Sequence, residues 1–139
     1  MKTIIDFLKE NDNVLKIPIG NHEITFQLQN EGVLMLINEW AYLINFSNVE
    51  FDIQDALYED HQINIRFCDF CGKPYDAGFV AGDGDWYCCE ECFEDAMNND
   101  YGNEGWRETE DEGEYGGFYE YLNASGKWED TGIYYTEWN

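Results

Sequence analysis

All five cysteines of the chain lie in one stretch, Arg66–Asn98, which reads RFCDFCGKPYDAGFVAGDGDWYCCEECFEDAMN. Cys68 and Cys71 form a Cys-x2-Cys pair, and a second group of cysteines follows at Cys88, Cys89 and Cys92. Two close groups of thiols at this separation have the spacing of a site in which four thiolates hold one zinc ion. We therefore expect one structural Zn²⁺ in this stretch, with four of the five cysteines as its ligands.

The residues around the cysteines predict the local structure that would bring them together. Two residues between Cys68 and Cys71 allow one tight turn to present both sulfur atoms, and Gly72 can adopt the left-handed conformation that closes the turn. Two short apolar runs within 78–87 flank an Asp-Gly turn and predict a β-hairpin. Residues 90–97 predict a short helix with acids in its first turn. This order of cysteine turn, hairpin and helix is the treble-clef arrangement.

Five cysteines for four ligand positions leave two alternatives open. Cys88 and Cys92 are four residues apart, and Cys89 and Cys92 are three apart. Either spacing places both sulfur atoms on one side of a first helical turn. The third ligand is therefore Cys88, with Cys89 as the alternative, and His61 is a reserve ligand because it precedes Cys68 closely.

Other uses of paired cysteines are disfavoured by the rest of the chain. Charged residues interrupt the apolar run of Met1–Glu10 too early for a signal peptide, so we expect a cytoplasmic protein. Thiols stay reduced in that compartment, which makes metal binding a better interpretation than disulfides. The two histidines both precede the cysteines, and an acidic environment disfavours the thiolate that a nucleophilic cysteine needs. We expect a non-catalytic site.

The charge of the chain excludes some classes of partner. Its 30 acidic and 7 basic residues give a formal net charge of -23. Such a field repels nucleic acids and anionic membrane surfaces. The chain also has no apolar run near the roughly 20 residues that a membrane-spanning helix needs. We therefore expect neither direct nucleic-acid binding nor a membrane association.

The first 65 residues predict a small α/β region. Thr3–Asn11 has the pattern of a short amphipathic helix with Thr3 as its cap. Residues 14–28 alternate around Gly20-Asn21 and predict a β-hairpin, in which Pro18 confines the first strand to an edge. The apolar maximum of the chain, 30–46, favours a helix through the spacing of its apolar residues, with two strands as the alternative. Asp52–Asp60 predicts a helix and 62–67 a strand.

Beyond residue 98 the chain becomes acidic, glycine-rich and aromatic. Residues 99–114 predict a loop or a mobile acidic segment. Residues 115–138 are dense in aromatic and β-forming residues, which predicts either a hairpin packed on the cysteine-rich region or a tail that orders on a partner. The aromatic residues that we expect to contact a partner are Trp106, Tyr119, Trp128, Tyr135 and Trp138.

The predicted fold class is α+β, in three parts. An α/β region, 1–65, is followed by a treble-clef zinc finger, 66–98, and an acidic aromatic segment, 99–139. The chain has no Pro/Ser-rich linker between the first two parts, so we expect them to share a packed interface.

Two motifs carry a resemblance to known families. FCDFCGKPY followed by WYCCEECF resembles the treble-clef fingers of the MYM and TRASH kind, whose second half reads Tyr/Phe-Cys-Ser-x-x-Cys. This resemblance implies that Cys88 and Cys92 are ligands and that Cys89 occupies the serine position. Together with Tyr135–Trp138, the motifs also resemble small zinc-binding proteins of bacterial mobile elements, with CDxCGK, YCSxEC and YWTEW. That resemblance implies a zinc-binding fold and no catalytic activity.

Three functions compete on this basis. The first is a zinc-stabilised interaction module that binds a basic protein, including one that itself handles nucleic acid. The second is a nucleic-acid mimic, whose carboxylates imitate a phosphate backbone and inhibit a DNA- or RNA-binding protein. The third is an enzyme with an unmarked carboxylate site, although the chain contains no HExxH, P-loop or Gly-x-Ser-x-Gly motif.

Overall fold

The structure is a computed structural model that describes residues 2–81, 84–109 and 118–137. By their contacts, the described residues form two compact units, 2–76 and 77–137. The described part contains three α-helices and four small sheets, which confirms the predicted α+β class. The boundaries predicted between the three parts of the chain, at residues 65 and 98, stay predictions.

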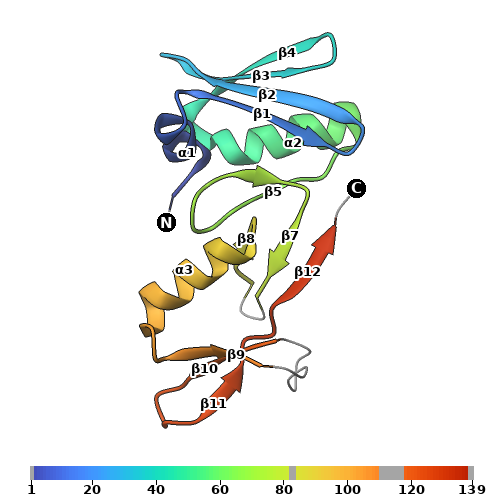
Figure 1. Ribbon diagram of the computed structural model, residues 1–139. Coiled ribbons are helices and arrows are strands. Elements are labelled where there is room, and N and C mark those ends of the chain that lie inside the picture. Colours follow the sequence, from blue (N-terminus) through green and yellow to red (C-terminus); the bar gives the residue numbers. More distant parts are fainter. Residues whose placement is uncertain (1, 82–83, 110–117, 138–139) are drawn as a thin grey trace. The chain divides into compact units, whose positions relative to one another are not determined.

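The first unit is built on a four-stranded antiparallel sheet in which each strand pairs with the next one along the chain (Figure 1). The predicted hairpin at 14–28 is confirmed, because Ile19 pairs with His22 across Gly20, whose φ is 60°. Pro18 lies in the edge strand of this sheet, as predicted. The strands are β1 (Val14–Ile19), β2 (His22–Leu28), β3 (Gly32–Ile37) and β4 (Trp40–Asn45).

The prediction of a helix for 30–46 is wrong, because this stretch forms the two strands β3 and β4, which were the alternative. The two strands meet at a turn in which Asn38 has a φ of 53°, a left-handed conformation that a helix cannot contain. Val33, Met35 and Ile37 are buried, while the leucines between them lie on the opposite face of the sheet. Apolar residues on both faces of a strand removed the alternation that would have marked it.

The helices of the first unit complete its core. Thr3 caps α1 (Ile4–Glu10) as predicted, since its backbone N–H donates to Asp6 Oδ2 over 2.9 Å. The predicted helix at Asp52–Asp60 is confirmed within α2 (Val49–His61), which follows a 3₁₀ turn, η1 (Phe46–Asn48). α1 and α2 lie on the same side of the sheet (Figure 1). Their buried apolar residues join those of the sheet in one hydrophobic core.

The strand predicted for 62–67 is correct only at its end. Gln62 ends α2 with a φ of 54°, and only β5 (Arg66–Phe67) pairs with β6 (Pro74–Tyr75). The backbone between the end of α2 and β5 has a side chain as a hydrogen-bond partner instead of a neighbouring strand. The side chain of Gln54 donates to the carbonyl of Ile65 over 3.0 Å. A side chain thus replaces part of the strand ladder that the alternation predicted.

The second unit contains two three-stranded sheets and one helix. The predicted hairpin is confirmed, with Phe79 opposite Tyr87, and the predicted helix is longer than expected. The loop predicted for 99–114 is wrong where β9 pairs with β10, and 110–114 lies outside the described residues. The elements are β7 (Ala77–Val80), β8 (Trp86–Tyr87), α3 (Glu90–Tyr101), β9 (Trp106–Glu108), β10 (Tyr119–Leu122), β11 (Trp128–Asp130) and β12 (Tyr134–Glu137).

Aromatic rings form the centre of the second unit. Phe93 of α3 meets Tyr87 and Tyr119 edge-on, with ring centroids 5.5 and 4.8 Å away. β10 and β11 form a hairpin, and β12 pairs with β7. The described part of the aromatic stretch at 115–138 therefore contains a hairpin, one of its two predicted alternatives.

Candidate metal centre

The first cysteine pair lies in a tight turn between β5 and β6. The backbone N–H of Cys68 donates to the carbonyl of Lys73, and the N–H of Gly72 donates to the carbonyl of Cys68, both over 2.9 Å. The N–H of Cys71 points at Cys68 Sγ, 3.5 Å away. An N–H aimed at a ligating sulfur stabilises its negative charge and fixes its orientation.

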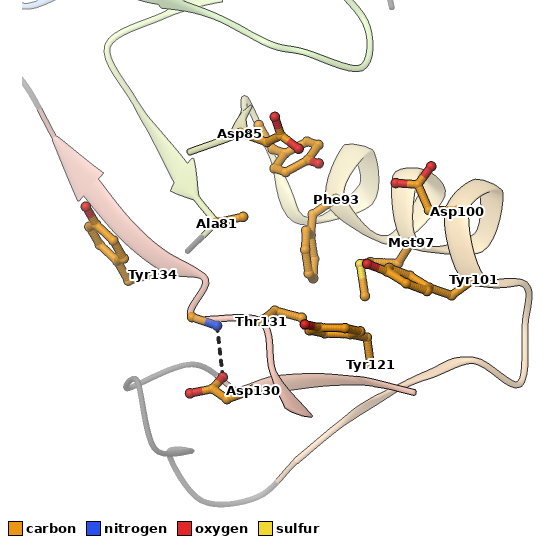
Figure 2. Close-up of a pocket in the computed structure, with 12 residues that line it drawn as sticks. Ala81, Asp85, Phe93, Met97, Asp100, Tyr101, Tyr121, Asp130, Thr131 and Tyr134 are labelled. Carbon is orange, nitrogen blue, oxygen red and sulfur yellow. Dashed lines mark hydrogen bonds between the residues drawn. The ribbon is translucent and has the colours of Figure 1, made fainter. Parts of the chain in front are cut away.

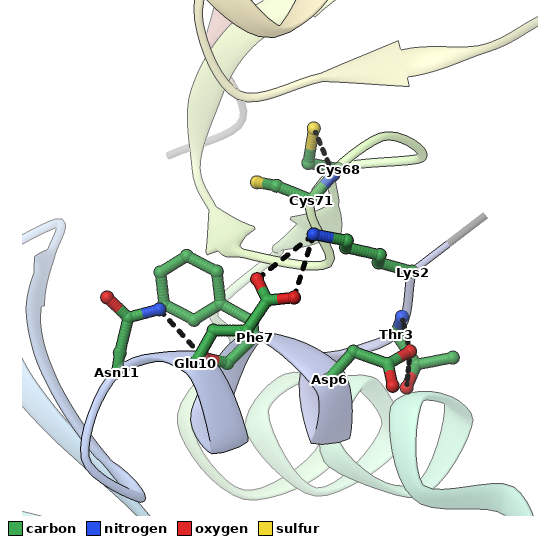
Figure 3. A network of polar contacts seen from close by, with 8 residues as sticks. All are labelled: Lys2, Thr3, Asp6, Phe7, Glu10, Asn11, Cys68 and Cys71. Atoms are coloured by element: carbon green, nitrogen blue, oxygen red, sulfur yellow. Dashed lines mark hydrogen bonds and ion pairs between the residues drawn. The ribbon is translucent and has the colours of Figure 1, made fainter.

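The N-terminus of α1 lies against this turn. Gly72 has a φ of +83°, and a Cβ atom at this position would stand 2.0 Å from the carbonyl oxygen of Thr3. Figure 3 shows Lys2 near Cys71, with its ammonium held by Glu10 over 2.8 Å. The hydrogen bond to Glu10 raises the pKa of Lys2, and the charges of Glu10, Asp6 and Cys71 also raise it. A lysine charge that is paired with Glu10 therefore lies near the cysteine turn.

The second cysteine group lies at the start of α3. Cys89 is the N-cap residue of the helix and is exposed, while Cys92 lies in the first turn. The Sγ atoms of Cys88 and Cys92 are 3.7 Å apart. The partial positive charge of a helix N-terminus favours a negatively charged sulfur at the position of Cys92.

Four cysteines, Cys68, Cys71, Cys88 and Cys92, place their sulfur atoms within 4.8 Å of one another. A tetrahedron of sulfur atoms about 2.3 Å from a central zinc ion has edges of about 3.8 Å. The distance between the Sγ atoms of Cys88 and Cys92 agrees with that edge, and four thiolates are one of the donor sets found in structural metal sites. The four cysteines can therefore hold a metal ion.

The two other candidate ligands lie outside this group. Cys89 is not among the four clustered sulfur atoms, although its Sγ is 3.8 Å from that of Cys88. His61 instead places Nε2 at 3.0 Å from the hydroxyl of Tyr42, which donates to Asp60. The choice between Cys88 and Cys89 as ligand stays a prediction, and the arrangement favours Cys88.

The aromatic residues expected to contact a partner differ in exposure. Tyr119 is buried beside Phe93, and its hydroxyl donates to Glu90 over 2.9 Å; burial and this bond raise its pKa. The half-buried Trp106 donates from Nε1 to Asn98. The half-buried Trp128 lies under the guanidinium of Arg107. Tyr135 is exposed, and Trp138 lies outside the described residues.

Two features of the site were missed by reasoning from the sequence. Lys2 and Thr3 lie more than sixty residues before the cysteine turn, yet both stand beside it. No local pattern marks either residue, because only the packing of α1 brings them to the turn. A glycine directly after Cys71 was the one available signal of a close backbone approach.

Comparison of the chain with protein-family models, curated proteins and solved structures found no match. Within 2–81, 84–109 and 118–137, no helix has the length and apolar character needed to cross a membrane.

Proposed function

We propose that the chain is a non-catalytic protein-interaction module, stabilised by one zinc ion, that binds a basic protein partner. The observation that carries the proposal is the group of four sulfur atoms within 4.8 Å, in a chain with a net charge of -23. The first feature supports a structural metal and the second an acidic binding surface.

Zinc would be held by Cys68, Cys71, Cys88 and Cys92 in a treble-clef finger. Four thiolates complete the tetrahedral shell of the ion, so no position is left for a substrate or a reactive water. The ion would supply folding free energy and no catalysis. The turn at Cys68–Gly72, the β7–β8 hairpin and the start of α3 provide the elements that this fold needs.

The acidic partner surface is supported by the residues from 99 to 139. This segment has 11 acidic and 2 basic residues, a local net charge of -9. One of the two bases, Arg107, already pairs with Glu120 over 2.9 Å. Opposite charge accelerates association with a basic protein, and exposed rings such as Tyr135 provide anchors for the contact. A basic protein that handles nucleic acid has the required charge.

The test must leave the fold intact, which excludes removing the residues after 99. That deletion would take away β12 and the ring of Tyr119 that packs on Phe93. We instead choose Tyr135→Ala, with Tyr58→Ala as the matched control, because both tyrosines are 56% exposed.

The full zinc-loaded chain serves as bait in an extract of its native host. We expect it to retain basic proteins at low salt and release them as salt rises, since screening weakens exposed charge pairs. Tyr135→Ala should retain less of them than Tyr58→Ala. Retention that is insensitive to salt, or equal loss in the two variants, would contradict the proposal.

A further inference from the structure

A cavity of about 570 Å³ opens within the second unit, lined by α3 and by residues that precede and follow this helix in the chain. Figure 2 shows Phe93, Met97 and Tyr121 around this space, with Thr131 and Tyr134 contributed by the later part of the chain. Its size falls in the range of about 300–1,000 Å³ that is usual for small-ligand sites. The cavity is large enough for one long side chain, and none of the four clustered cysteines is among its described lining residues.

The charges around this cavity have one sign. Asp85, Asp100 and Asp130 all line it, and none of its described lining residues is basic. Asp130 is held in place because Oδ1 accepts the backbone N–H of Gly132 over 3.0 Å (Figure 2). Three carboxylates that line one cavity favour a cationic occupant, because a cleft lined by charges of one sign attracts the opposite charge.

The remaining walls also suit a cation. Tyr101 and Tyr121 stack with ring centroids 5.1 Å apart, and the buried rings of Tyr87 and Phe93 lie behind the cavity wall. The negative face of an aromatic ring attracts a cation within about 6 Å of its centroid. Rings and carboxylates together therefore recognise a group that is both flat and positively charged.

The same unit already holds one guanidinium in this way. Arg107 lies over the ring of Trp128 at 4.1 Å from its centroid and pairs with Glu120 over 2.9 Å. A guanidinium is planar, stacks on aromatic faces and directs its N–H groups sideways to carboxylates. The more strongly hydrated ammonium of a lysine gains less from such walls.

We propose that this cavity binds the guanidinium group of an arginine side chain supplied by the partner protein. The proposal rests on the proposed function only for the source of the arginine. It adds the residue type that the partner must present and the place where this residue enters.

The probe is N-acetyl-L-arginine amide, whose guanidinium is its only charge, added to the zinc-loaded full chain. The matched neutral probe is N-acetyl-L-citrulline amide, which has nearly the same shape. We expect saturable shifts in the amide NMR signals of Thr131 and Gly132 with the arginine probe, with a Kd on the order of 1 mM, and no saturation with citrulline. Equal binding of the two probes, or of N-acetyl-L-lysine amide and the arginine probe, would overturn the proposal.

Two aspartates of α3 allow binding in the cavity to be distinguished from general attraction to the negative charge of the chain. Asp95 and Asp100 are both exposed, but only Asp100 lines the cavity, and each loses one charge on replacement by asparagine. We expect Asp100→Asn to weaken the arginine probe about 3- to 10-fold and Asp95→Asn to change its Kd by less than about 2-fold. Tyr134→Ala, which removes an exposed ring from the cavity, should also weaken it. Equal weakening by Asp100→Asn and Asp95→Asn would show nonspecific attraction and reject the cavity as the site.

The experiment distinguishes this inference from the proposed function. If the arginine probe fails to bind while basic proteins are still captured, the cavity assignment is wrong and the proposed function stands. If the probe binds but no basic protein is captured, the cavity assignment stands and the proposed function is wrong.

Discussion

Cys88 and Cys89 are neighbours in the chain, but their sulfur atoms have different surroundings in the structure. Cys88 belongs to the group of four clustered sulfur atoms, whereas Cys89 occupies the N-cap position of α3 without a side-chain capping hydrogen bond and is exposed. Replacing a ligand by serine removes a thiolate that zinc needs, while replacing an N-cap cysteine by serine keeps a residue that is favoured at that position. The two substitutions should therefore have opposite effects on metal content.

We expect Cys88→Ser and Cys92→Ser to lose the metal and Cys89→Ser to retain it. Elemental analysis of freshly purified, reduced protein should find about one zinc ion per chain in the unmodified protein and in Cys89→Ser. Loss in Cys89→Ser with retention in Cys88→Ser would reverse the assignment. Less than about half an equivalent in the unmodified chain would remove zinc from the proposal.

Gly72 is required for two separate reasons. Its φ of +83° is costly for a residue with a side chain, and a Cβ atom would meet the carbonyl oxygen of Thr3 at 2.0 Å. We expect Gly72→Ala to lower the free energy of unfolding by about 2–4 kcal/mol, because either α1 or the turn must shift. Urea unfolding monitored by circular dichroism measures the change.

The control for this substitution is Gly126→Ala. Gly126 has a similar φ of +77°, but nothing lies within 4 Å of the added Cβ. Only the cost of a left-handed backbone conformation applies at Gly126, so we expect the free energy of unfolding to fall by about 1 kcal/mol. If the two variants lost equal stability, the close approach of Thr3 to Gly72 would contribute nothing.

α2 carries a carboxyl group that its position makes unfavourable at neutral pH. Glu50, in the first turn of α2, is half-buried, and its Oε2 accepts the N–H of Ile4 over 3.2 Å. Burial raises the pKa of Glu50, the bond from Ile4 opposes this, and the charges of Asp69 and Asp6 raise it further. A folded pKa above the unfolded value means that the contribution of Glu50 is favourable at acid pH and is lost as pH rises through the folded pKa.

Glu50→Gln should therefore stabilise the protein at pH 7. The amide keeps an acceptor for the N–H of Ile4 and removes the charge. We expect a gain below about 1 kcal/mol, since the group is half exposed and solvent screens it. The gain should vanish below about pH 4, where the glutamate itself is protonated. Unfolding free energies measured between these pH values, with the exposed Glu59→Gln as control, test the sign; a gain that is largest at acid pH would contradict it.

The excess of negative charge affects the stability of the whole chain. A net charge of -23 destabilises a compact state through self-repulsion, and added salt screens it. The Debye length falls from about 30 Å at 10 mM to about 8 Å at 150 mM ionic strength. We expect the urea midpoint of the zinc-loaded chain to rise over this range. Urea is the suitable denaturant because guanidinium chloride is itself a salt.

Chloride and sulfate at equal ionic strength provide the control for this measurement. Screening depends on ionic strength, so the two salts should raise the midpoint by similar amounts. A rise with sulfate alone would indicate exclusion of that anion from the protein surface. A midpoint that fell with both salts would mean that favourable charge pairs outweigh repulsion.

Local patterns were sufficient for much of the fold. The cap of α1 at Thr3, the hairpin around Gly20 and the hairpin of β7 and β8 were predicted because short-range turn and capping chemistry specifies each one. The stretch at 30–46 was predicted wrongly because its apolar residues lie on both faces of β3 and β4. β9 was missed because three residues pair only with a partner further along the chain.

The sequence by itself determined the two groups of cysteines, the sign of the charge and the class of the fold. These properties depend on residue types and short spacings, which are present before the chain folds. Only the tertiary structure placed Cys88 and not Cys89 in the sulfur group, brought Thr3 against Gly72, and buried Tyr119 while leaving Tyr135 exposed. It also assembled the cavity, whose aspartates at 85, 100 and 130 lie far apart in the chain. Contacts over such separations depend on packing and burial, which no local pattern specifies.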